Sequence, residues 1–332
     1  LNFIEFKDFE QCHLDFDTYL VIQAGIPYKM RDELKVGSAV KIIQWVAFEY
    51  NLVPYMYQFN AFRQLQEKYF SLYLLFWYLD YKKAKMLSDW AKEMISRGSI
   101  AFMSKKMYDV TEKYLHFKEK VPITYLPLVS GGETSYTLDN VIRKQESIKD
   151  CLHLAWLGRI ADFKVHILNY SIQLLSKLAK KNKINIHFHI IGNGDFTHLL
   201  NIDHSHEYFR ITNVGVLEKN QSDAYFHEKI HALLAMGTSS IDGARVGLPV
   251  ILLDYSYVPI VEDYLFRYLH HTLDYDLGHP MVAADFSKGN TSLEDMLNEI
   301  VHNYQELSSS SLNYYKSHHD AKQTVEKLLI LL

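Results

Sequence analysis

Short apolar runs recur along this chain, and most of them end at a glycine or a proline. In the C-terminal half, the runs at residues 152–157 and 250–253 are apolar almost throughout, and residues 184–191 alternate before they become fully apolar. Such runs are typical of strands that are buried on both faces of a parallel sheet. Segments with helical spacing separate the strands, so the order predicts an α/β fold.

The N-terminal half repeats this pattern, and a polar stretch over residues 130–149 is typical of a linker between two domains. The expected strands of this half lie at residues 16–25, 41–49, 100–104 and 121–127, with a helix through Tyr114 after the third. We expect one domain at residues 1–140, a second at residues 150–310 and a terminal helical segment at residues 311–332. Thr291 to Leu307 is expected to be a helix that the serine run at residues 308–311 ends.

The segment at residues 236–254 combines a glycine turn, a short helix and a buried strand. Gly237 removes the side chain where a ligand approaches the backbone, and Thr238, Ser239 and Ser240 place hydroxyls and amides at a helix N-terminus. Gly-Leu-Pro at residues 247–249 then ends the helix. This order predicts a phosphate-binding turn, although an ordinary helix cap has the same spacing.

Two cations follow the apolar strand at residues 152–157. Gly158 and Arg159 come directly after it, and Lys164 follows five residues later. Because ligands of open parallel sheets bind at the carboxyl ends of the strands, a guanidinium and an ammonium at this place suit the two phosphates of a nucleotide sugar. Solvated surface charges are the alternative interpretation.

A second glycine turn, Gly192-Asn-Gly194, ends the strand at residues 184–191 and leads into an expected helix from Thr197. Thr197 stands where the dinucleotide-binding fingerprint requires its third glycine, and no acidic residue ends the following strand. A Gly-x-Gly turn alone is therefore weak evidence for any ligand.

Taken in this order, the motifs resemble the nucleotide-sugar half of GT-B glycosyltransferases, in particular the retaining group known as glycosyltransferase family four. The resemblance implies two Rossmann-like domains whose parallel sheets face a central cleft, with the N-terminal domain truncated or atypical because its usual glycine-rich loop is not found. It covers residues 151 to about 260. The donor-binding residues that it implies are Gly158, Gly192, Gly194, Val216, Leu217, Gly237, Thr238, Ser239, Ser240 and Asp242.

One departure from the family pattern concerns its two glutamates, of which the first lies near the donor sugar and the second on the ribose. Asp242 stands at the second position, where it is expected to bind the ribose. The alternative is that it is only a carboxylate in the first turn of the helix, where the helix dipole favours a negative charge. Leu234 stands eight residues earlier, so the first glutamate is missing. This leaves the identity of the donor and the stabilisation of the reacting sugar open.

The resemblance implies transfer of a sugar from a UDP- or GDP-sugar to a hydroxyl of a glycan or lipid-linked glycan, as in bacterial-type surface polysaccharide synthesis. Arg159, Lys164 and the helix N-terminus would stabilise the departing diphosphate, so that no metal and no cofactor is required. Glu49, at a strand end, is the candidate for contacting the acceptor hydroxyl or acting as base, with an exposed structural carboxylate as the alternative interpretation, and His13 is the other candidate in this domain. A nucleotide-sugar epimerase of the same fold and an inactive nucleotide-sugar-binding protein remain alternative functions.

Composition narrows the class of protein. The 332 residues are 48% hydrophobic and 22% charged with a formal net charge of −4, so no basic excess indicates nucleic-acid binding. Two cysteines cannot build a disulfide framework, which fits a reducing cytosol. His187 and His189, like His318 and His319, make no recognisable zinc pattern.

The apolar and aromatic run at residues 69–79 raises the question of membrane contact. As a helix its eleven residues span about 16 Å, against roughly 30 Å for a bilayer core, so it cannot cross a membrane. Burial is favoured because the run lacks a polar face, and an interfacial helix followed by lysines is the alternative. No secretory leader pattern opens the chain at Leu1. We therefore expect a cytoplasmic protein, with peripheral contact to the inner face of the membrane as a second option.

Overall fold

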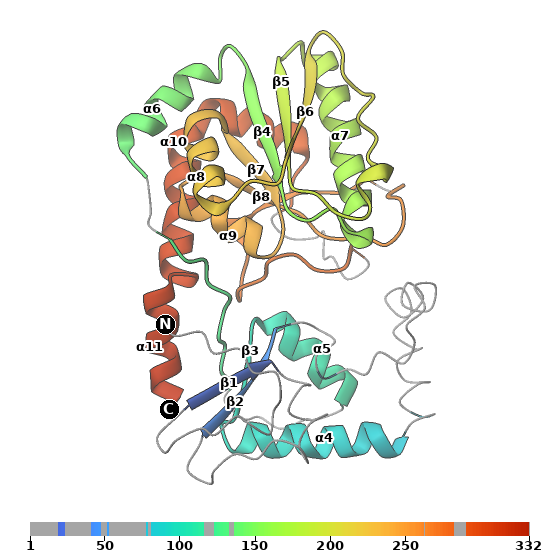
Figure 1. Cartoon of the computed structure of the whole chain (residues 1–332), viewed down its shortest axis with the longest axis vertical. Coiled ribbons are helices and arrows are strands. Elements are labelled where there is room, and N and C mark those ends of the chain that lie inside the picture. Colours follow the sequence, from blue (N-terminus) through green and yellow to red (C-terminus); the bar gives the residue numbers. More distant parts are fainter. Residues whose placement is uncertain are drawn as a thin grey trace. The chain divides into compact units, whose positions relative to one another are not determined.

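In the computed structural model, residues 19–23, 41–47, 52, 78, 81–115, 123–132, 136–261, 263–281 and 290–331 are described. The chain divides into two compact units (Figure 1), of which unit 1 combines Leu1–Leu128 with Lys322–Leu332 and unit 2 is Val129–Ala321. Each unit contains a parallel sheet with helices, so the α/β fold predicted from the apolar runs is confirmed.

Unit 2 is built on a six-stranded sheet with the order β6-β5-β4-β7-β8-β9. All neighbouring strands pair in parallel except β8 and β9, which are antiparallel. The strands are β4 (Leu152–Leu157), β5 (Ile186–Ile191), β6 (Phe209–Gly215), β7 (Ala232–Ala235), β8 (Val250–Leu252) and β9 (Arg267–Tyr268).

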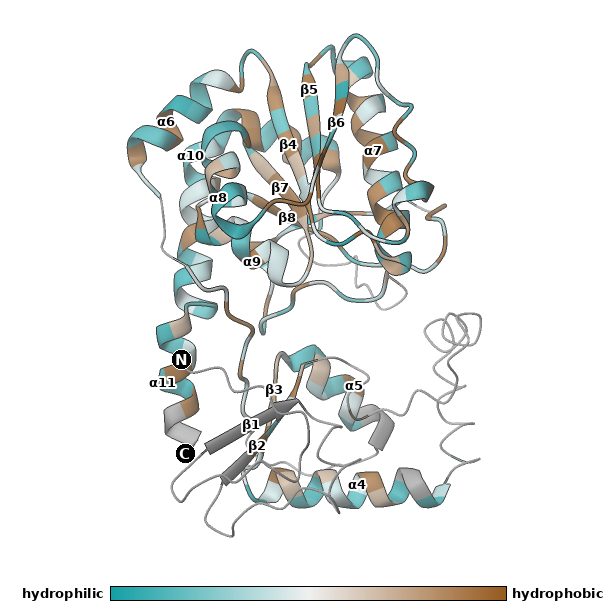
Figure 2. Cartoon of the chain, in the orientation of Figure 1, coloured by the Kyte–Doolittle hydropathy of each residue, from teal (hydrophilic) through white to brown (hydrophobic). Residues whose placement is uncertain are grey.

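Burial on both faces explains why β4, β7 and β8 are largely apolar. Leu154 and Trp156 of β4 are fully buried in one core with Phe188 of β5. Hydrophobic residues accordingly concentrate in β4, β7 and β8 (Figure 2). Two helices complete this core, namely α7 (Asp162–Asn182) and α10 (Leu293–His318).

The strand order places a switch point at β4. From β4 the chain adds β5 and β6 on one side and then returns to add β7 on the other side. The loops that follow β4 and β7 therefore leave the sheet in opposite directions, and this is where open α/β sheets bind ligands. Both loops carry motifs that the sequence singled out.

The remaining helices of unit 2 are α6 (Leu138–Ser147), α8 (Lys219–Lys229) and α9 (Thr238–Arg245), with short 3₁₀ turns η2 (Thr197–Leu199) and η3 (Leu269–His271). The helix expected from Thr197 is thus only a turn. Its residues are held locally, because the Thr197 hydroxyl donates to the Gly194 carbonyl oxygen at 2.7 Å.

The prediction that the serine run ends the helix near residue 307 is wrong, since α10 continues to His318. Ser308 and Ser311 are fully buried within it, and Ser308 Oγ donates to the carbonyl oxygen of Gly247. Ser309 Oγ shares a hydrogen bond of 3.1 Å with the hydroxyl of Tyr136. Tertiary packing therefore outweighs the weak helix propensity of serine here.

Unit 1 contains a three-stranded parallel sheet with the order β1-β2-β3. Phe102 and Val46 are fully buried in its core, and Leu328 packs against a second cluster that contains Ile43. Tyr125, in the expected strand at residues 121–127, pairs with Phe102 only as an isolated bridge. The elements are β1 (Tyr19–Gln23), β2 (Lys41–Val46), β3 (Ile100–Phe102), α4 (Tyr81–Ser96), α5 (Lys105–Leu115) and α11 (Ala321–Leu331).

Some predictions lie outside the described residues. They include Glu49 as a candidate base, His13 as the other candidate, and all of the aromatic run at residues 69–79 except Tyr78. Among the helices that are described, none has the length and apolar character needed to span a bilayer.

Candidate functional site

The loop after β4 and the start of α9 meet at Gly158. A Cβ atom placed on Gly158 would lie 3.5 Å from Ser239 Oγ and 3.6 Å from Lys164 Nζ. Two motifs that are 75 residues apart in the sequence thus come together, because β4 and β7 are neighbours in the sheet. The absence of a side chain at Gly158, where φ is +149°, keeps the space between the ammonium and the hydroxyl open.

Two cations lie at this place without a neutralising carboxylate. Lys164 is half-buried in the first turn of α7, and burial, followed by the charge of Arg159, lowers its pKa to about 8. Arg159 itself is exposed. In the part of unit 2 that the structure describes, no ion pair reaches either side chain. Such a pair of cations favours a bound anion, whose negative charge would raise the pKa of Lys164 again.

The N-terminus of α9 supplies the amides and hydroxyls. Gly237, with φ +62° and ψ −143°, precedes the helix and adopts a backbone conformation that other residues avoid. Thr238 is exposed and Ser239 is half-buried, whereas Ser240 is fully buried and its Oγ donates to the Gly237 carbonyl oxygen at 2.6 Å. Thr238 and Ser239 therefore present hydroxyls at the surface, and the hydroxyl of Ser240 closes the first helical turn.

The Gly-x-Gly turn after β5 packs directly on the β4 loop. A Cβ atom on Gly192 would lie 2.1 Å from the carbonyl oxygen of Gly158, and one on Gly194 would lie 2.2 Å from that of Ile160. The amide of Ile160 also donates to the carbonyl oxygen of Asn193 at 3.1 Å. These glycines are thus required for backbone packing, whether or not they contact a ligand.

Val216 and Leu217 follow β6 at the same edge of the sheet. Val216 is 70% exposed, which is high for an apolar side chain, and Leu217 is half-buried. The turn after β6 is hydrogen-bonded to the turn after β5, since the Gly192 amide donates to the Gly215 carbonyl oxygen at 2.8 Å. An apolar surface next to main-chain groups can pack against the face of a nucleobase.

The carboxylate of Asp242 already has two partners. Its Oδ1 accepts from Lys219 Nζ at 3.0 Å and from Ser130 Oγ at 2.5 Å. Neither partner is predictable from the sequence, because the residue types at positions 130 and 219 follow no motif. A ribose at Asp242 would have to share or displace these contacts.

The position of the missing family glutamate lies inside the sheet. Leu234 is a fully buried residue of β7. Only Met236 and Gly237 separate β7 from α9, so this loop carries no carboxylate.

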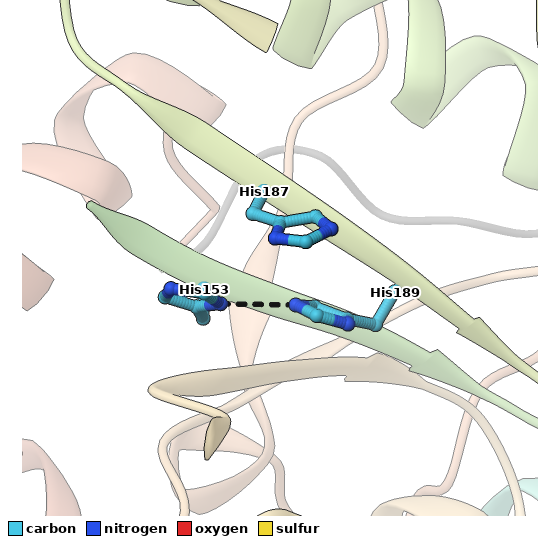
Figure 3. A group of neighbouring side chains, drawn as sticks. All are labelled: His153, His187 and His189. Carbon is cyan, nitrogen blue, oxygen red and sulfur yellow. Dashed lines mark hydrogen bonds between the residues drawn. The ribbon is translucent and has the colours of Figure 1, made fainter. Parts of the chain in front are cut away.

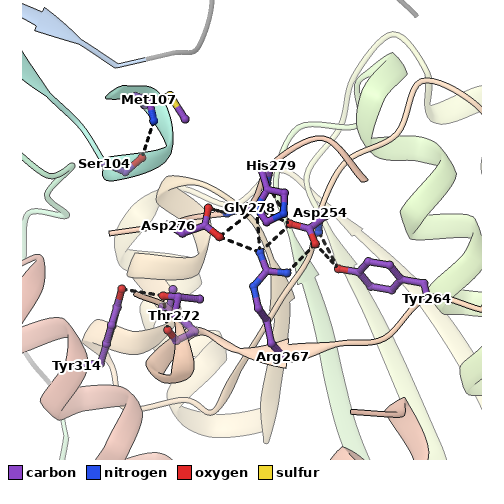
Figure 4. Close-up of polar contacts among 11 residues, drawn as sticks. Ser104, Met107, Asp254, Tyr264, Arg267, Thr272, Asp276, Gly278, His279 and Tyr314 are labelled. Carbon is purple, nitrogen blue, oxygen red and sulfur yellow. Dashed lines mark hydrogen bonds and ion pairs between the residues drawn. The ribbon is translucent and has the colours of Figure 1, made fainter. Parts of the chain in front are cut away.

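Arg267, Asp254, Asp276 and His279 form a largely buried ionic network (Figure 4). Arg267 donates to both carboxylate oxygens of the fully buried Asp254, at 2.6 Å and 2.7 Å, and also to Asp276 at 3.1 Å. Next to Asp276, the carbonyl oxygen of Leu277 accepts from the Gly237 amide at 2.8 Å. The network thus fixes the backbone that positions Gly237.

Comparison with solved structures gives the fold. A mutant of TarM from S. aureus, in complex with fondaparinux, α-GlcNAc-glycerol and UDP, matches 94% of this chain with a TM-score of 0.51 and 12% identity. The pneumococcal O-GlcNAc transferase GtfA, in complex with UDP and GlcNAc, matches 70% of this chain and 44% of its own with a TM-score of 0.40 and 16% identity. WaaG, a glycosyltransferase of lipopolysaccharide biosynthesis, matches 88% of this chain and 75% of its own with a TM-score of 0.41 and 14% identity.

The predicted GT-B fold is confirmed by the similarity to TarM. This chain spans only 55% of the TarM chain. No protein-family model and no curated protein sequence matches the chain.

Proposed function

We propose that this GT-B chain is a glycosyltransferase whose unit 2 binds the diphosphate of a nucleotide-sugar donor. The observation that carries the proposal is the meeting of Lys164 and Ser239 at Gly158, beside the exposed guanidinium of Arg159. A half-buried and an exposed cation beside a helix N-terminus, at the switch point of a parallel sheet, suit a diphosphate. The TarM structure contains UDP, which makes UDP the first nucleoside diphosphate to test and GDP the second.

The reaction breaks the bond between the anomeric carbon and the phosphate oxygen and forms a bond from that carbon to an acceptor hydroxyl oxygen. Negative charge develops on the departing diphosphate. In this proposal, Arg159, Lys164 and the first amides of α9 stabilise that charge, and the chemistry requires no metal ion. The acceptor proton passes to the departing phosphate. Retention at the anomeric carbon rests on the resemblance to family four.

The acceptor is proposed to be a glycan or a lipid-linked glycan in bacterial-type surface polysaccharide synthesis. The TarM complex contains α-GlcNAc-glycerol and an oligosaccharide, which supports a glycan hydroxyl as the attacking group. A cytoplasmic location, with contact to the inner membrane surface when the acceptor is lipid-linked, follows from this proposal.

A second candidate is a protein that binds nucleotide sugars without turnover. The observation that favours it is the loop between β7 and α9, which has no carboxylate near the position of the donor sugar. The pairing of Asp242 with Lys219 points the same way, because it occupies the one acidic group that the motif retains.

The test is turnover of UDP- and GDP-sugars with glycan acceptors, measured as release of the nucleoside diphosphate. Lys164→Ala and Arg159→Ala are each expected to lower kcat/KM by about 10- to 100-fold, since each removes a charge-assisted contact to phosphate. Lys180→Ala is the matched control, because it removes an exposed cation from the same helix about 24 Å away. Near-normal turnover in both site variants would remove the assignment, and nucleotide binding without turnover would favour the second candidate.

A further inference from the structure

Three histidines gather on one face of the sheet of unit 2 (Figure 3). His153 in β4 pairs in register with His187 in β5, and His189 lies two residues further along β5. Because side chains alternate along a strand, His187 and His189 point to the same face. This face is opposite to the one that carries Leu154 and Phe188 in the core.

The spacing of the ring nitrogens suits a single metal ion. One nitrogen from each imidazole lies within 4.8 Å of the other two. His153 Nδ1 and His189 Nε2 are 3.0 Å apart. Two nitrogens that each lie about 2.0–2.1 Å from a tetrahedral Zn²⁺ would be about 3.3–3.4 Å apart, so a small adjustment brings this pair onto one ion.

The second ring nitrogen of two of these histidines is held by a hydroxyl. His189 Nδ1 lies 2.8 Å from the Tyr225 hydroxyl, and His187 Nε2 lies 2.8 Å from Thr212 Oγ1. Metal-binding histidines commonly donate their other N–H to such an outer partner, which fixes the tautomer and the ring orientation. The cluster therefore has both inward-facing nitrogens and outer hydrogen bonds.

We propose that His153, His187 and His189 form a binding site for a divalent transition-metal ion, with Zn²⁺ as the reference ion. Imidazole is a preferred ligand of Zn²⁺, Ni²⁺, Cu²⁺ and Co²⁺, and three such ligands leave one coordination position for water. The ion links β4 to β5. His153 precedes Gly158 by five strand residues, about 16 Å, so the metal site is separate from the diphosphate site.

Binding needs a change of tautomer but no net loss of a proton. The hydrogen bond between His153 and His189 requires one of the two facing nitrogens to carry a proton. When both nitrogens bind the metal, that proton moves to the outer nitrogen of the same ring. For His189 the outer nitrogen is Nδ1, which then donates to the Tyr225 hydroxyl.

The test is Zn²⁺ binding to the untagged full chain after chelator treatment, followed by calorimetry, together with the visible absorption spectrum of Co²⁺ in the same protein. We expect one equivalent to bind and tetrahedral Co²⁺ bands to appear. His187→Gln and His153→Gln are each expected to weaken binding at least tenfold, and Tyr225→Phe about tenfold. His302→Gln, an exposed histidine of α10, is the matched control and leaves binding unchanged.

The positive charge of Lys229 provides a second test, because a like charge near a bound cation weakens its binding. Lys229 Nζ lies 4.9 Å from the centroid of the Tyr225 ring, whose hydroxyl contacts His189 Nδ1, so its positive charge is close to the cluster. Lys229→Gln removes a like charge and is expected to tighten Zn²⁺ binding by roughly three- to tenfold.

Three outcomes would overturn the proposal. They are no saturable binding by the folded protein, binding that His302→Gln weakens as much as His187→Gln, and octahedral Co²⁺ spectra that all variants share. Circular dichroism of each variant separates the loss of ligands from the loss of fold, and nucleotide binding by the same samples is expected to persist because the diphosphate site is distinct.

Discussion

Gly192 lies against Gly158 so closely that a Cβ atom on Gly192 would be 2.1 Å from the Gly158 carbonyl oxygen. The φ angle of Gly192, +133°, is also one that L-residues rarely adopt. Gly192→Ala is therefore expected to destabilise unit 2 by about 1–3 kcal/mol, through overpacking and backbone strain together. Urea unfolding followed by circular dichroism measures this free energy.

Gly131→Ala is the matched control for that experiment. Nothing lies within 4 Å of a Cβ atom at Gly131, and its φ lies outside the left-handed region. Its unfolding free energy should stay within about 0.5 kcal/mol of the original. Equal destabilisation by both substitutions would show that the packing of Gly192 on Gly158 is not what matters.

Nucleotide binding is expected to weaken in alkaline solution because of Lys164. Its pKa, lowered to about 8 chiefly by burial, means that the ammonium of the free protein loses its charge as the pH rises through 8. Affinity for UDP should then be flat between pH 6.5 and pH 7.5 and fall by at most about tenfold per pH unit above pH 8. Lys164→Arg keeps its charge and should give a flat profile. Identical profiles for the two proteins would contradict the prediction.

Asp242 is expected to hold the ribose, which requires it to share its carboxylate with Lys219. Asp242→Asn should weaken UDP binding about tenfold by removing a charged acceptor. Lys219→Met removes an exposed ion-pair partner, so stability should change by less than about 1 kcal/mol and binding by less than about threefold. If Lys219→Met weakens binding as strongly as Asp242→Asn, the lysine contributes to the site instead.

The buried pair of Arg267 and Asp254 should be sensitive to removal of one partner. Arg267→Met leaves the fully buried Asp254 without its cation, at an expected cost of about 3–5 kcal/mol in unfolding free energy. Combining Arg267→Met with Asp254→Leu should recover part of that loss, because no unpaired carboxylate is then left at the fully buried position, although Asp276 also loses its arginine partner and keeps the contact with His279 Nδ1 at 3.1 Å. A double variant that is less stable than Arg267→Met would show that the pair itself is strongly stabilising.

Much of unit 2 could be predicted from the sequence, because β4, β7 and β8 are apolar over most of their length and each strand that leads to the site ends at a glycine or small polar turn. The approach of Lys164 to Ser239 could not be read from spacing, since it depends on β7 pairing with β4 after two intervening strands. The resemblance to GT-B proteins supplied that order.

Other features depend on tertiary contacts between positions without a motif. Lys219 pairs with Asp242 across 23 residues, and Ser130 reaches the same carboxylate across 112. His153 joins His187 only through the register of β4 with β5. Ser308 of α10 belongs to this class as well, because its hydroxyl donates to the carbonyl oxygen of Gly247, which is 61 residues away in the sequence.

The most direct test of the diphosphate site is calorimetric titration of the purified chain with UDP and GDP, for the unmodified protein, Lys164→Ala and Lys180→Ala. We predict saturable binding of one equivalent that Lys164→Ala weakens by about 10- to 100-fold and Lys180→Ala leaves unchanged. Failure of the folded protein to bind either nucleotide, or equal affinity in all three proteins, would contradict the assignment of this site.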